Sequence, residues 1–208
     1  MRDLLGHTSR SLSTVETYLD AAPGEPGGPV DMADAVAYYQ ATADALADSA
    51  VVVERGRAAG AGLGEDPRIA LSALVARVPE RVRAVPATAL VRTPFGTMTL
   101  EGYLPTRTFE LTVHTCDLAA ALGLSTAVPP AAAADTFGVI GGLAAAQGTA
   151  SAALLALTGR RSLTAAYSVF LTPPAQRRTT RVDRVPESDS TYGRVGVSTD
   201  RPIRGTRL

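Results

Sequence analysis

Residues 93–123 read TPFGTMTLEGYLPTRTFELTVHTCDLAAALG, and the spacing of the apolar residues changes along this stretch. Two short alternating runs, residues 88–92 just before this stretch and residues 97–100 within it, flank Pro94-Phe95-Gly96, a pattern typical of a β-hairpin. From Leu100 or Pro105 onward, the apolar residues recur at helical spacing as far as Leu122, and Gly123 is a residue type that commonly follows a helix end. The stretch therefore predicts a small hairpin that leads into a long helix.

Helical spacing also dominates the segments on either side of this stretch. Asp66-Pro67 is the clearest start signal, because it places an N-cap carboxylate before a proline at the first helical position. The buried face of the helix that follows is expected to contain Leu71, Leu74, Val75, Val78 and Val82. Further helices are expected over residues 1–20, 31–59 and 130–157, and a strand over residues 162–171. The prediction is a mainly α, up-down helical bundle with a small β-hairpin before the ligand-bearing helix.

Charge divides the chain into an acidic body and a basic tail. Residues 1–171 contain 12 arginines and 16 acidic residues, whereas residues 172–208 contain 8 arginines and 4 acidic residues. The tail is polar and nearly free of leucine and isoleucine, so we expect residues 1–171 to form the bundle and residues 172–208 to be disordered. An acidic body lacks the clustered positive charge that binds phosphate backbones, and we expect no nucleic-acid partner.

Hydropathy and cysteine content narrow the class of protein further. No apolar run approaches the ~20 residues that a membrane-spanning helix needs, and the first residues lack a signal-peptide pattern. We therefore expect a cytoplasmic protein with no membrane partner. Cys116 is the single cysteine, so the chain cannot form an internal disulfide. It follows His114 by two residues, about 200° around the helix, and is expected to pack in the core.

Both histidines of the chain lie in helical sequence. Glu110 precedes His114 by four residues, so their side chains project from one helix face about one turn apart. With His7 from the first helix, they supply two imidazoles and one carboxylate. Such a set holds a divalent ion and leaves coordination positions open for water or substrate. The sequence thus predicts a metal site at His7, Glu110 and His114.

A plainer interpretation of the same pair is a solvated one, because a glutamate four residues before a histidine is common on helix surfaces. Apolar neighbours such as Phe109 favour the metal site, since polar groups on a packed helix need partners. Asp117 follows His114 by three residues and Asp3 precedes His7 by four. Each aspartate could accept a hydrogen bond within the site and orient a ligand, or be a solvated carboxylate.

Two further patterns carry no catalytic signature. The glycines between Gly60 and Gly64 follow no strand, and the chain has no lysine, so phosphate-loop and dinucleotide-binding mechanisms are excluded and a loop is expected there. Ser9, Ser11 and Ser13 lack the Gly-x-Ser-x-Gly elbow of serine hydrolases. Neither pattern competes with the predicted metal site.

Three strings carry a resemblance to a known family: RDLLGHT at residues 2–8, TPFGTMTL at 93–100 and RTFELTVHTCDL at 107–118. They resemble the mycothiol-dependent maleylpyruvate isomerase family, part of the DinB-like group of metal-binding four-helix bundles. In that family, a histidine on an early helix and a glutamate and histidine four residues apart on a late helix bind a divalent metal, usually zinc. The resemblance covers roughly residues 2–170 and carries these ligand roles to His7, Glu110 and His114.

The resemblance implies an enzyme that uses the thiol mycothiol as a metal-activated nucleophile, with no nucleophile from the chain itself. The reaction would be isomerisation of a maleylpyruvate-like cis-enoic acid or transfer of the thiol to an electrophile. The alternative is a bundle that binds metal or thiol without turnover, as a sensor or interaction module. Arg107 could receive a carboxylate of a bound molecule, or form a salt bridge with Glu101 or another acid.

One departure from the family pattern concerns the start of the chain. Family members normally have a further helix and a tryptophan-containing turn before the first metal-binding histidine. This sequence has no tryptophan and reaches His7 almost at once. We therefore expect a bundle without its first helix, either because the start was assigned inside a longer reading frame or because another chain, such as a second copy in a homodimer, fills the gap.

Overall fold

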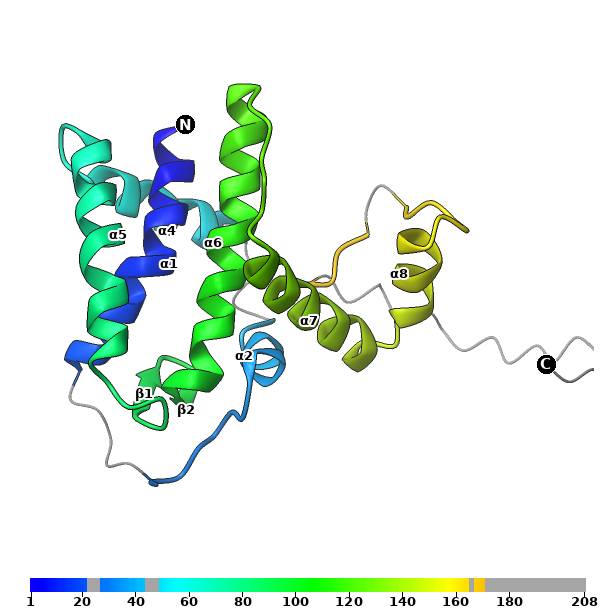
Figure 1. Ribbon diagram of the computed structural model, residues 1–208, viewed down its shortest axis with the longest axis horizontal. Helices are drawn as coiled ribbons and strands as arrows, with labels where there is room; N and C mark the ends of the chain where they lie inside the picture. Colours follow the sequence, from blue (N-terminus) through cyan, green and yellow to red (C-terminus); the bar gives the residue numbers. More distant parts are fainter. Residues whose placement is uncertain (22–26, 44–48, 165–166, 171–208) are drawn as a thin grey trace, which may run out of the picture. The chain divides into compact units, whose positions relative to one another are not determined.

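The computed structural model describes residues 1–21, 27–43, 49–164 and 167–170, which belong to one compact unit, Met1–Pro173. The described part of the chain holds a two-stranded sheet and these helices (Figure 1): α1 (Arg2–Asp20), α2 (Ala35–Ala41), α4 (Ser49–Gly62), α5 (Pro67–Arg83), α6 (Leu100–Leu122), α7 (Pro130–Ala146) and α8 (Ala150–Leu157). This mainly α architecture, with a hairpin directly before α6, confirms the predicted fold class. The tail expected to be disordered, residues 172–208, lies outside the described residues.

Local sequence signals account for the ends of the two helices that were predicted most clearly. The Asp66 carboxylate accepts a hydrogen bond from the Arg68 amide at 2.9 Å, which caps the start of α5. The Thr99 hydroxyl accepts one from the Gly102 amide at 3.1 Å and caps α6 in the same way. At the other end of α6, Gly123 adopts a φ of 66°, the left-handed conformation that glycine allows without strain.

Helix α1 lies at the centre of the bundle and packs against α4, α5 and α6. In Figure 1, α5 and α6 flank it, and α6 runs antiparallel to both. Ion pairs on the exposed side tie α5 to α1, with Arg77 Nε 2.7 Å from Glu16 Oε1. Exposed pairs of this kind contribute ~1 kcal/mol or less, so apolar packing holds the helices together.

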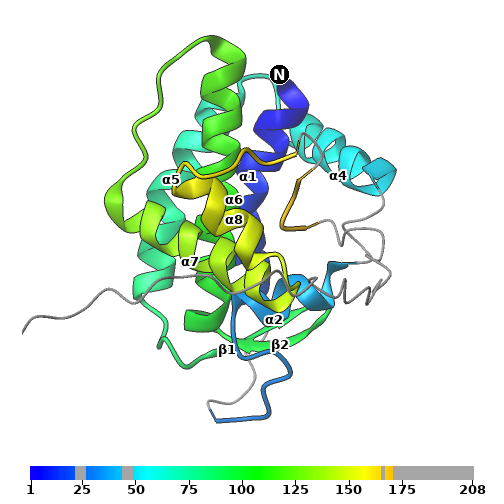
Figure 2. The ribbon, with the colours of Figure 1, turned by 90° about the vertical axis from the view of Figure 1, so that its right-hand side faces the viewer.

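The contact between α1 and α4 is a backbone contact, which Figure 2 shows at the N-terminal half of α1. A Cβ on Gly6 would lie 2.2 Å from the Gly56 carbonyl oxygen, and one on Gly60 would lie 2.7 Å from the Arg2 carbonyl oxygen. Neither position has room for a side chain unless the helices separate. Glycine at both positions therefore sets the distance between α1 and α4.

The hairpin fixes the start of α6. Strand β1 (Leu90–Thr93) pairs antiparallel with β2 (Gly96–Thr99), with Val91 opposite Met98. Both of these side chains are completely buried, and Leu100 and Tyr103 in the first turn of α6 continue the same core. The predicted hairpin is thus confirmed, and its packing holds α6 in register with α1.

Two of the expected helices are interrupted. The stretch 31–59 does not form one helix, because α2 ends at Ala41 and Thr42 follows as its cap; α4 then extends past Gly60 to Gly62, where a loop was expected. Helix 130–157 is broken where Gly148 adopts a φ of 71° between α7 and α8. Alanine-rich sequence favours helix throughout both stretches, so composition alone did not reveal the breaks.

Smaller corrections concern burial and the last expected strand. Leu74 and Val78 on α5 are buried as predicted, but Val75 is 58 % exposed, because only one stripe of α5 faces α1. No strand forms over residues 162–164 and 167–170, the described part of the expected strand at 162–171. No helix within the described ranges is long and apolar enough to cross a membrane.

Candidate functional site

A cavity of about 330 Å³ opens between the helices that meet around α1 and α6. Its walls come from α1, α2, α4, α6, the hairpin turn and the end of the described chain: His7, Arg10, Ser11, Tyr38, Tyr39, Thr42, Val52, Arg55, Phe95, Arg107, Glu110, His114 and Phe170. The three predicted metal ligands and Arg107 are all in this set. Residues more than 100 positions apart in the sequence therefore reach one cavity.

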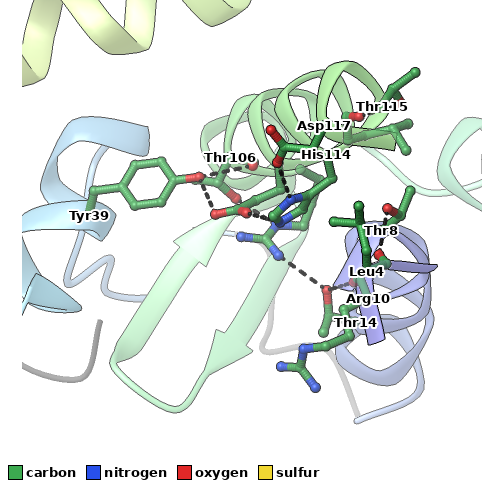
Figure 3. A network of polar contacts seen from close by, with 12 residues as sticks. Leu4, Thr8, Arg10, Thr14, Tyr39, Thr106, His114, Thr115 and Asp117 are labelled. Atoms are coloured by element: carbon green, nitrogen blue, oxygen red, sulfur yellow. Dashed lines mark hydrogen bonds and ion pairs between the residues drawn. The ribbon is translucent and has the colours of Figure 1, made fainter. Parts of the chain in front are cut away.

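Helix α6 presents Glu110 and His114 to the cavity one turn apart, as their spacing predicts. The Nε2 atom of His114 is 3.2 Å from Glu110 Oε2, and the two side chains are 23 % and 26 % exposed. On the other side of the ring, Nδ1 is 3.3 Å from Asp117 Oδ2, a contact visible in Figure 3. The hydrogen bond with Glu110, and further that with Asp117, raise the pKa of His114 above its ordinary value.

The pKa of the Glu110 carboxyl shifts in the opposite direction, downward. Burial acts to raise its pKa, but the hydrogen bond with His114, the charge of Arg107 and the hydrogen bond from Tyr39 outweigh burial and lower it. Glu110 is therefore a carboxylate at neutral pH. A carboxylate beside an imidazole gives the cavity two of the donors that divalent transition metals prefer.

His7 approaches the same place from α1. Its ring centroid is 5.7 Å from that of His114. Burial, together with the neighbouring His114, lowers the pKa of His7, which favours the neutral imidazole that binds metals. Asp3 is exposed and makes no hydrogen bond with His7 within the described residues, which agrees with the second interpretation of this residue, a solvated carboxylate.

The chemistry of these donors and the distance between the two imidazole rings fit a divalent cation, whereas the present arrangement of all three donors does not. Two imidazoles that share one ion have ring centroids about 5 Å apart, given metal–nitrogen distances near 2.0 Å, and the observed 5.7 Å is close to that. As the side chains stand, however, no group of three or more His, Cys, Asp or Glu residues in the described ranges is arranged to hold a metal ion. His114 Nε2 bonds directly to Glu110 instead. Coordination would require this hydrogen bond to open.

Tyr39 on α2 is a site residue that the sequence did not reveal. Its hydroxyl lies 2.9 Å from Glu110 Oε1 and 3.2 Å from the Thr106 carbonyl oxygen, and Figure 3 shows it reaching α6 from the opposite side to α1. Burial, and then the charge of Glu110, raise the pKa of Tyr39, so the hydroxyl stays protonated and donates. It thereby leaves Oε2 of Glu110 free to face His114. No local pattern relates positions 39 and 110.

Replacing Tyr39 with phenylalanine is expected to weaken Zn²⁺ binding by about 10- to 100-fold, the usual cost of removing a hydrogen bond that orients a metal ligand. The ring itself is 3 % exposed and packs against Phe109 and Phe170, contacts that phenylalanine retains. A competition titration with a chromophoric chelator measures the affinity. Tyr167→Phe is the matched control, because the cavity does not include Tyr167. Equal affinities for the two variants would show that Tyr39 does not orient Glu110.

Arg107 lies deeper in the cavity than expected for a surface ion pair. Its guanidinium carbon is 5.0 Å from the centroid of the Tyr103 ring, and its Nε donates to the Thr106 hydroxyl at 2.9 Å. Among the described residues, it makes no ion pair with a carboxylate, and Glu101 is exposed. Six helical positions separate 101 from 107, which puts the two side chains on different faces. The salt bridge with Glu101 is therefore absent.

Ser11 on α1 adds an unsatisfied group to the cavity wall. It is 2 % exposed, and its hydroxyl has no hydrogen-bond partner in the described part of the chain. Leaving a buried hydroxyl unpaired costs about 1–3 kcal/mol, so such groups commonly mark a place where a ligand or water binds. The serine was considered from sequence only as a hydrolase nucleophile, and its value as a donor depends on burial that sequence does not show.

The cavity and its helices define a class: an α-helical domain with a largely apolar pocket that also carries imidazole, carboxylate and guanidinium groups, between helices that are far apart in sequence. A model of the family described as mycothiol maleylpyruvate isomerase N-terminal domain matches residues 1–119, and the chain belongs to that family. The match runs from α1 to Ala119 in α6 and includes His7, Tyr39, Arg107, Glu110 and His114. Neither the comparison with curated proteins nor that with solved structures gave a match.

Proposed function

We propose that this protein is a divalent-metal-dependent enzyme that uses mycothiol as its nucleophile. Its reaction would be the isomerisation of a maleylpyruvate-like cis-enoic acid or the transfer of the thiol to an electrophile. One observation carries the proposal: His7, Glu110 and His114 meet at a cavity that also holds an arginine without a carboxylate partner among the described residues. The choice of mycothiol as the thiol rests on the family, whose description names it.

The three ligand side chains set where the chemistry takes place. A divalent cation, with zinc the expected ion, supplies one thing when bound: it lowers the pKa of a thiol that binds to it, which yields a thiolate at neutral pH. His7, Glu110 and His114 would hold the cation, and the hydrogen bond from Tyr39 keeps Glu110 turned toward His114. Three protein donors leave coordination positions open, as a catalytic site requires.

Arg107 and Ser11 would bind the acid to be converted. A guanidinium forms two parallel hydrogen bonds with a carboxylate. The Arg107 guanidinium packs over the rings of Tyr103 and Tyr38, which hold it in place. The unpaired hydroxyl of Ser11 could donate a further hydrogen bond to an oxygen of the same molecule. A cavity of about 330 Å³ suits a small molecule. The cis-enoic acid would thus be anchored by its carboxylate with its double bond near the thiol.

A binding protein without turnover is the second candidate. The direct contact between His114 Nε2 and Glu110 Oε2 occupies two of the three proposed donors with each other, which favours a module that binds thiol without a metal. A sensor or interaction module would need only to bind metal or thiol. The two candidates differ in turnover, which a kinetic assay measures.

The test is to follow a mixture of mycothiol and maleylpyruvate spectroscopically with the Zn²⁺-loaded protein. The proposal predicts isomerisation in which thiol is regenerated, and loss of the activity after chelation and dialysis. If no isomerisation occurs, a panel of electrophiles tests transfer, in which thiol is consumed. Binding of thiol without either reaction would favour the second candidate, and the absence of both metal and thiol binding would rule out both.

A further inference from the structure

Gly56 on α4 packs against the imidazole of His7. A Cβ on Gly56 would lie 2.0 Å from His7 Nε2, 2.3 Å from Cδ2 and 2.7 Å from Cε1. Because three consecutive ring atoms are this close, Gly56 lies against the face of the His7 ring and not in the ring plane beyond Nε2. The contact therefore does not block the lone pair of the imidazole nitrogen, which lies in the ring plane. Any side chain at position 56 would overlap with the ring.

The surroundings of this contact decide what moves if a side chain is added. Just before His7 on α1, the backbones of α1 and α4 already touch, where Gly6 meets Gly56 and Gly60 and where Arg2 meets Gly60. The nearest atoms to a Cβ at Gly56, by contrast, all belong to the end of one flexible side chain. The His7 ring is therefore the group that yields, and the two helices keep their distance.

The glycine is also unfavourable for the helix that carries it. Glycine in a helix interior is less stable than alanine, because it loses more backbone freedom on folding. Gly62 on the same helix has no atom within 4 Å of a Cβ built on it, so no packing contact requires glycine there. At Gly56, the space taken by His7 gives a physical reason for a residue that the helix itself disfavours.

We propose that Gly56 is a positioning residue of the metal centre: it provides the surface on which the His7 imidazole lies and so places that ligand opposite Glu110 and His114. The inference rests on the proposed metal site. It assigns to α4, which supplies none of the three predicted ligands, a role in setting the geometry of the donor set. The role is steric, since glycine contributes only the absence of a side chain.

The test compares Gly56→Ala with Gly62→Ala, using Zn²⁺ as the probe. Competition with a chromophoric chelator gives the Zn²⁺ affinity, and thermal unfolding of the chelator-treated protein reports on the fold without metal. We expect Gly56→Ala to weaken Zn²⁺ binding by about tenfold or more, the effect of disturbing a group that orients a metal ligand. The midpoint of unfolding should move by less than about 4 °C. Gly62→Ala should retain the affinity of the unchanged protein.

A double-mutant cycle separates positioning of His7 from any other effect of the added methyl group. In His7→Ala, the ring is gone, so a methyl group at position 56 has nothing to displace. The double variant with Gly56→Ala should therefore bind Zn²⁺ no more weakly than His7→Ala alone. A purely structural role for Gly56 would instead lower the affinity by the same factor in both backgrounds.

Each outcome bears on one claim. Unchanged Zn²⁺ affinity in Gly56→Ala overturns the inference and leaves the metal site standing. A large fall in the unfolding midpoint with equal losses in both backgrounds also overturns it, because Gly56 would then support the fold. If the unchanged protein itself binds no Zn²⁺, the proposed function fails and this inference fails with it.

Discussion

Replacing His114 with alanine is expected to weaken Zn²⁺ binding by about 10³-fold, or roughly 4 kcal/mol, because it removes one of three protein donors. The same change breaks the contacts of the ring with Glu110 and Asp117. Those pairs are partly solvated, so the free energy of unfolding of the metal-free protein should fall by only ~1 kcal/mol. The signature is thus a large loss of affinity with little loss of stability. A competition titration and chemical denaturation measure the two quantities.

Thr115→Ala is the matched control for this prediction. Thr115 neighbours His114 on α6 but is exposed, and its hydroxyl donates to the Leu111 carbonyl of its own helix. The control should bind Zn²⁺ as tightly as the unchanged protein. If His114→Ala did so as well, His114 would not be a metal ligand, and the assignment of Glu110 as its partner on α6 would fall too.

Arg107→Met is expected to weaken the binding of maleate, a simple cis-enedioic acid, by about 100-fold. Truncating one partner of a desolvated charge pair costs about 2–5 kcal/mol, and methionine preserves most of the volume of the side chain. Arg107→Lys should recover only part of the loss, because an ammonium cannot form the paired hydrogen bonds of a guanidinium. Isothermal titration of the Zn²⁺-loaded protein with maleate gives the affinities.

Arg92→Met provides the comparison for the loss of charge alone. Arg92 is exposed on β1 and does not line the cavity. Removing it lowers the positive charge of the protein by the same amount, yet maleate binding should be unchanged. Equal affinities of Arg107→Met and the unchanged protein would show that the acid binds elsewhere, and the role proposed for Arg107 would be wrong.

The sequence predicted those parts of the fold that short-range patterns control. Asp66-Pro67 marked the start of α5, Leu90 to Thr99 formed the hairpin around the predicted turn, and α6 ended at Gly123 as predicted. In each case the deciding interaction joins residues a few positions apart. Capping hydrogen bonds, turn geometry and helix periodicity all have this range, which is why they can be read locally.

The errors have two sources, a local helix end hidden by composition and burial that depends on neighbouring helices. The expected helix over 130–157 is broken at Gly148, where a left-handed glycine ends α7 and the Thr149 amide donates to the Ala144 carbonyl, although the alanine-rich sequence on both sides favours helix. Val75 looks like a core residue by periodicity and is nevertheless exposed, because α1 covers only one stripe of α5. Which face of a helix is covered depends on its neighbours, and their arrangement is not contained in the spacing of one helix.

Some residues of the candidate site could likewise be predicted from local sequence, and others could not. Glu110 and His114 were found through their four-residue spacing, and His7 was added because it is the other histidine and matches the family motif. Tyr39 and Gly56 could not be found in this way. The Tyr39 hydroxyl donates to Glu110 across 71 positions, and Gly56 leaves room for the His7 ring across 49. Both contacts depend on how α2 and α4 pack against α6 and α1.

The most direct test of the account is the metal content of the protein, purified without chelator and then titrated with Zn²⁺. Elemental analysis should find about one divalent ion per chain at saturation, as three protein donors around one open site require. The ion should be displaced by chelator and absent from His114→Ala under the same conditions. A protein that is isolated empty and takes up no divalent ion would contradict the central claim that His7, Glu110 and His114 form a metal site.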